Sequence, residues 1–78
     1  MGATRSEWLV RIGEVLSVDP PTPDEVEVLL EIAGVAAHAS ERTSAPLTCW
    51  LVARAAVHPR EAALLVQSVA DEVERSGE

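Results

Sequence analysis

Most residues whose types and spacing could support chemistry lie between His38 and Thr48. His38 and Glu41 are three positions apart, so on a helix they would share one face and could act as an acid/base pair. A structural role fits the same pattern, because cations such as His38 and Arg42 stabilise a helix C-terminus by about 0.3–1 kcal/mol each. No nucleophile or second base stands at a fixed position beside this pair. We therefore expect no catalytic residues and no enzymatic activity.

The second half of this stretch has groups that could bind an anion. A helix that starts near residue 45 would present free backbone amides beside the hydroxyls of Thr43 and Thr48 and the guanidinium of Arg42. Hydroxyl residues before a helix are also ordinary caps, and Pro46 removes one of the amide donors. A carboxylate or phosphate site and plain helix capping therefore both remain possible here.

Arg54 is the one charged residue in an otherwise apolar segment. A buried guanidinium needs a carboxylate partner, because an unpaired buried charge costs several kcal/mol. Glu27 and Glu31 are the candidate partners, and contact with a ligand is the alternative. The full set of candidate ligand-binding residues is His38, Glu41, Arg42, Thr43, Thr48 and Arg54.

No metal site and no cofactor are expected. His38 and His58 are far apart in the sequence, and no His-x-x-x-His or Cys-x-x-Cys pattern occurs. Glu31 and His38 would share a helix face, but they would lie about 10 Å apart along its axis. Cys49 is most simply a buried thiol on an apolar helix.

The charge of the chain limits its partners. The formal net charge is −7, and no two of the six basic residues are adjacent. This pattern disfavours nucleic acid and anionic membrane surfaces. No apolar run approaches the length of about 20 residues that spans a membrane. Residues 1–7 lack the features of a signal peptide, and Cys49 has no second cysteine to pair with, so a cytoplasmic location is expected.

Hydrophobic periodicity and helix-start signals predict an all-α protein. Residues 4–7 have capping-box spacing, and residues 22–25 combine a cap, a proline at the first helical position and two acids. The predicted helices form one domain over residues 1–78, arranged as a compact four-helix bundle or orthogonal array. Their predicted limits are about 5–17, 23–41, 45–57 and 59–75.

The two middle segments are apolar around most of their circumference, which predicts that both are buried. A four-helix unit of 78 residues can surround one such helix but hardly two. We therefore expect a homodimer or docking onto another protein, since large apolar surfaces mark interfaces. The alternative is a monomer with half-covered alanine-rich faces. Trp8 and Trp50 are predicted core anchors, or rim residues if an interface exists.

The chain also resembles a small actinobacterial family of unknown function. The resemblance covers about residues 7–73, and its most specific part is the His-x-x-Glu-Arg-x-x-Ala-Pro-Leu-Thr string at 38–48. Members of that family occur alone or fused to the C-terminal end of molybdenum cofactor guanylyltransferase. The resemblance implies an accessory module associated with molybdenum cofactor biosynthesis. Together with the excess apolar helix surface, it leads us to expect a non-catalytic accessory or protein-interaction domain. The alternative from the residues themselves is a small-molecule or anion-binding module that uses the corner at 38–48.

Overall fold

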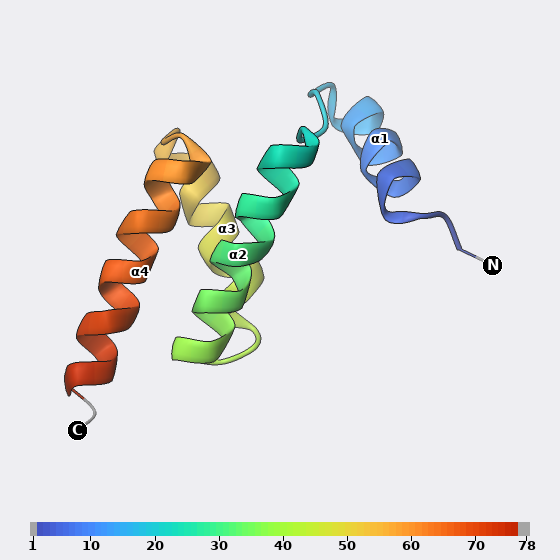
Figure 1. Cartoon of the computed structure of the whole chain (residues 1–78). Helices are drawn as coiled ribbons and strands as arrows, with labels where there is room; N and C mark the ends of the chain where they lie inside the picture. Colours follow the sequence, from blue (N-terminus) through green and yellow to red (C-terminus); the bar gives the residue numbers. More distant parts are fainter. Residues whose placement is uncertain (1, 77–78) are drawn as a thin grey trace.

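The structure is a computed structural model that describes residues 2–76. Those residues form four helices and no strand, which confirms the all-α class. The helices are α1 (Arg5–Leu16), α2 (Pro23–Ala39), α3 (Ser44–Ala55) and α4 (Pro59–Ser76) (Figure 1). Each helix end lies within two residues of its predicted position.

Capping boxes start the first two helices, as their sequences predict. Thr4 N–H donates to Glu7 Oε1 (3.1 Å), and Glu7 N–H donates to Thr4 Oγ1 (3.2 Å). Thr22 and Glu25 repeat the pattern at the start of α2, with distances of 2.8 and 3.2 Å. Each box satisfies backbone donors that the first helical turn would otherwise leave unpaired.

Helix α1 ends in a tight turn at Ser17 and Val18, the elbow, just before Pro20. Ser17 adopts the left-handed conformation with a φ of 60°, and Val18 N–H donates to Gly13 O (2.9 Å). Gly13 permits this close return, because a Cβ atom at that position would lie 2.7 Å from Val18 O. Pro20 and Pro21 then restrict the remaining linker to α2.

Helix α2 is the centre of the fold, and α3 and α4 both pack against it. The buried apolar residues of the described chain are Ile32 and Ala36 on α2 and Ala62 on α4. Helix α3 contributes no fully buried residue, so its predicted burial is wrong. One flank of α3 meets α2, and no described element covers the rest of its apolar surface.

Helix α1 stands apart from the bundle of α2, α3 and α4 (Figure 1). The Cα radius of gyration is 14.0 Å, whereas a compact chain of this length has about 11.5 Å. The helices therefore leave much of their apolar surface uncovered, because one of the four does not cover the other three.

Candidate functional site

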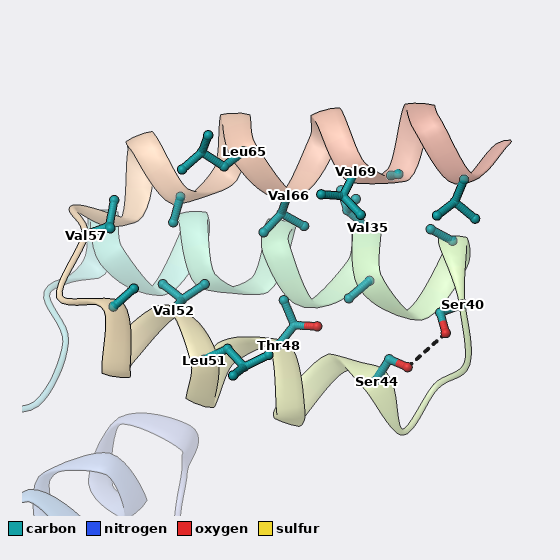
Figure 2. A pocket seen from close by; sticks show the side chains of 16 residues that line it. Val35, Ser40, Ser44, Thr48, Leu51, Val52, Val57, Leu65, Val66 and Val69 are labelled. Carbon is teal, nitrogen blue, oxygen red and sulfur yellow. Dashed lines mark hydrogen bonds between the residues drawn. The ribbon is translucent and has the colours of Figure 1, made fainter. Parts of the chain in front are cut away.

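An open groove runs between α3 and α4, with α2 behind it (Figure 2). Its volume is about 550 Å³. The lining residues recur every three or four positions, so each helix presents one face to the groove. They are Val35, Ala36, Ala39 and Ser40, then Ser44, Thr48, Leu51, Val52, Ala55 and Val57, then Ala62, Leu65, Val66, Val69, Ala70 and Val73.

The groove is apolar along most of its length. Within residues 2–76, no charged side chain lines it. Two of its hydroxyl groups meet at one end, where Ser44 Oγ donates to Ser40 Oγ (3.1 Å), while Thr48 lies midway and Val57 at the opposite end (Figure 2). Leu65 and Val69 on α4 remain more than half exposed. The groove therefore suits an apolar occupant rather than a charged one.

The candidate residues of the 38–48 corner do not converge on one site. His38 is exposed in the last turn of α2 and borders a second pocket beside Gln67 and Glu74. Glu41, Arg42 and Thr43 are exposed in the loop that joins α2 to α3. Thr48 is half-buried and is the one member of the candidate set that lines the groove.

The start of α3 offers few free donors to an anion. Ser44 N–H donates to Glu41 O (2.8 Å), and Ala45 N–H donates to Arg42 O (3.2 Å). Pro46 carries no N–H. Thr43 precedes the helix but makes no side-chain capping hydrogen bond. These amides already donate hydrogen bonds to carbonyl groups of the loop and are not free for an anion. The geometry therefore does not favour the anion-binding alternative.

Arg54 has no carboxylate partner among the described residues, so the predicted pairing with Glu27 or Glu31 is wrong. Its guanidinium carbon lies 4.8 Å from the ring centroid of Trp50, one helical turn away. Both side chains are exposed, and a cation–π contact of this kind contributes about 0.5–1 kcal/mol. Arg54 is on an open side of α3, so its charge stays in water and needs no buried partner.

The two tryptophans are not core residues. Trp8 is 59% exposed on α1, and Trp50 is 58% exposed on α3. Their predicted role as core anchors is therefore wrong, because no other helix of the described chain packs over them. Exposed tryptophans agree with the alternative of an interface rim.

Cys49 lies half-buried between α3 and α2, with its Sγ 4.0 Å from Leu29 O. Burial raises the pKa of the Cys49 thiol above its usual value. A thiol in this state is a poor nucleophile at neutral pH. Cys49 therefore serves packing, as its apolar surroundings in the sequence suggested.

Metal and membrane sites have no counterpart in the described chain. Residues 2–76 hold no cluster of three or more His, Cys, Asp or Glu side chains that could bind a metal ion. None of the described helices combines the length and the apolar character needed to cross a bilayer.

The sequence did not predict the groove, although it showed the apolar helix faces that line it. The apolar face of the fourth predicted helix contains Leu65, Val66, Val69 and Val73, which now form one wall. The excess of apolar surface on the third helix indicated that something must cover it. The sequence could not show that α3 and α4 stand apart and leave a groove between them.

The fold and the groove define a small all-α domain with an uncovered apolar groove. The chain belongs to the DUF6457 family, a domain of unknown function whose profile matches residues 2–78. Neither a curated protein nor a solved structure matches the chain.

Proposed function

We propose that this chain is a non-catalytic helical protein-interaction domain that binds through its apolar groove and the apolar side chains around it. One observation carries the proposal. The chain exposes 6320 Å² of surface, whereas a compact monomer of its 8.3 kDa mass exposes about 4,600 Å². The chain thus leaves more surface open than a compact monomer would, and an extended surface that is apolar marks protein–protein interfaces.

The exposed side chains support the same proposal. Thirteen large apolar side chains of the described residues are between 48% and 74% exposed. Each of the four helices carries at least one of them, and Leu51, Leu65, Val69 and Val73 line the groove. The non-catalytic part of the proposal follows from the groove lining, which offers no acid, base or activated nucleophile to a substrate.

We further propose an accessory role in molybdenum cofactor biosynthesis, with molybdenum cofactor guanylyltransferase as a candidate partner. The support is the resemblance of residues 38–48 to a family that occurs fused to that enzyme. Fusion holds two proteins at a high effective concentration, so a chain that is not fused would have to bind the enzyme to reach the same proximity.

Sedimentation velocity tests the proposal. The purified chain is run alone from low micromolar to several hundred micromolar, and again with a purified molybdenum cofactor guanylyltransferase. We expect a dimer, a complex with the enzyme, or both. A chain that sediments as a monomer at every concentration, alone and with the enzyme, would overturn the proposed function.

A further inference from the structure

We infer that the groove between α3 and α4 is filled by α1 of a second copy of this chain, so that two chains exchange their first helices in a symmetric dimer. This inference rests on the proposed interaction function and names the occupant of its binding surface.

The groove has the form left by a missing helix. Helices α2, α3 and α4 supply three members of a bundle, and the groove lies where a fourth would pack. Its walls recur at intervals of three and four residues, the spacing that receives the ridges of a neighbouring helix. Helix α3 and helix α1 both contain 12 residues, so α1 matches the wall beside which it would lie.

Helix α1 carries an apolar face that the described chain covers only in part. Trp8, Ile12, Val15 and Leu16 recur at helical spacing; Ile12 is half-buried, but Val15 and Leu16 are 71% and 64% exposed. The helix contains two arginines and two glutamates, so its formal charge is zero in a chain of −7. An uncharged helix is the part of an acidic chain that a second copy can accept with least repulsion.

The elbow favours a second copy over closure onto the same chain. The bond from Val18 to Gly13 and the left-handed Ser17 fix the direction in which the linker leaves α1. Pro20 and Pro21 stiffen the linker, and Figure 1 shows that α1 points away from the bundle. A short, stiff hinge that keeps a helix from folding back onto its own chain favours the exchange of that helix between chains.

The area agrees with a dimer. The excess surface is about 1,700 Å² per chain relative to a compact monomer. Two chains that each bury this amount form an interface of about 3,400 Å², within the range of obligate homodimers. The described groove lining contains no charged residue, so the groove itself contributes no charge to this interface.

Variants of the full chain test the inference by sedimentation equilibrium. Leu65→Asp places a carboxylate in the groove, and Val15→Asp places one on the apolar face of α1. Each is expected to raise the dimer Kd by about 100-fold or more, because an unpaired carboxylate is strongly disfavoured in an apolar interface. Leu64→Asp is the matched control, since Leu64 is 74% exposed and does not line the groove. It should leave the dimer unchanged.

Mixing the two damaging variants identifies exchange. The Leu65→Asp chain keeps an intact α1, and the Val15→Asp chain keeps an intact groove. An equimolar mixture should therefore form a heterodimer through one intact contact, although each variant alone is monomeric. Both substitutions are at exposed positions, and circular dichroism checks that the helices persist; Val69→Asp replaces Leu65→Asp if the latter unfolds.

Several outcomes would overturn the inference. A Val15→Asp dimer as tight as the wild type would show that α1 does not fill the groove. A mixture that stays monomeric would contradict exchange, as would a wild-type chain that is monomeric at all concentrations. If that monomer still bound the guanylyltransferase, the proposed function would survive and the inference alone would fail. A chain that stays monomeric and does not bind the guanylyltransferase would contradict both the proposed function and the inference.

Discussion

Helices α1 and α2 begin with the same capping motif but differ in how far their apolar faces are buried. Each starts with a Thr-x-x-Glu capping box in which both reciprocal bonds are formed. Yet Ile32 on α2 is 1% exposed, while the apolar face of α1 is largely open to solvent. Capping thus determines where a helix starts, and neighbouring elements determine whether its apolar face is buried. The difference indicates that α1 is complete as a helix but lacks the surface on which it packs.

The largest expected effect contrasts the centre of α2 with the face of α1. Ile32→Ala should lower the free energy of unfolding by about 2–5 kcal/mol, because it removes methyl groups from the most buried side chain of the described residues. Trp8→Ala should change the unfolding of dilute, monomeric protein little, since Trp8 is exposed. Urea denaturation followed by circular dichroism measures both variants. Equal losses from the two substitutions would contradict the contrast.

Two glycines sharpen the comparison between the elbow and the bundle. Gly13→Ala should destabilise the protein by about 1–3 kcal/mol, because the new Cβ atom would collide with Val18 O. Gly34→Ala should stabilise it by roughly 0.5–1 kcal/mol, since Gly34 is in the interior of α2 and no atom lies within 4 Å of the new Cβ. Thermal unfolding of the two variants should therefore shift in opposite directions. Shifts of the same sign would show that the elbow is looser than the structure indicates.

Loss of the capping threonine should destabilise the whole bundle at α2 but only a single helix at α1. Thr22→Ala is expected to lower global stability by about 0.5–2 kcal/mol, because α2 is the helix on which α3 and α4 pack. Thr4→Ala removes an equivalent bond from α1 and should fray that helix alone. Amide hydrogen exchange in dilute protein separates the two results. Loss of protection throughout α2–α4 in the Thr4→Ala variant would contradict the independence of α1.

The smallest expected effect is a pH response of α1. Hydrogen bonds from the Thr4 side chain, and then from the Thr4 backbone, lower the pKa of Glu7 below its ordinary value. A carboxylate with a lowered folded pKa stabilises the helix above its unfolded pKa, and this contribution is lost as pH falls through the folded value. The Thr4 amide resonance should therefore move with acidification below the usual glutamate range. Glu7→Gln keeps a capping partner without a titrating group and should abolish that movement.

The features that the sequence predicted are those with local causes. Capping boxes, prolines and hydrophobic spacing act within a few residues, so four helices and their ends follow from them. The pairing of Arg54 with a glutamate and the burial of Trp50 depend on which helices become neighbours, and both predictions failed for that reason. Of the six candidate site residues, Thr48 alone lines the groove. The candidates were chosen as polar residues, and most of these lie on the solvent-exposed surface, whereas the groove is made mainly of valine, leucine and alanine.

The central claim is that α1 is buried by a second chain, and tryptophan fluorescence tests it most directly. In a Trp50→Phe variant, Trp8 is the sole tryptophan and reports on α1 alone. Its emission and its quenching by acrylamide are measured from low to high micromolar protein. We predict an exposed, readily quenched Trp8 in dilute protein, and a blue-shifted, protected Trp8 once the chains associate. A Trp8 that stays equally accessible at every concentration, or equally protected at every concentration, would contradict this prediction.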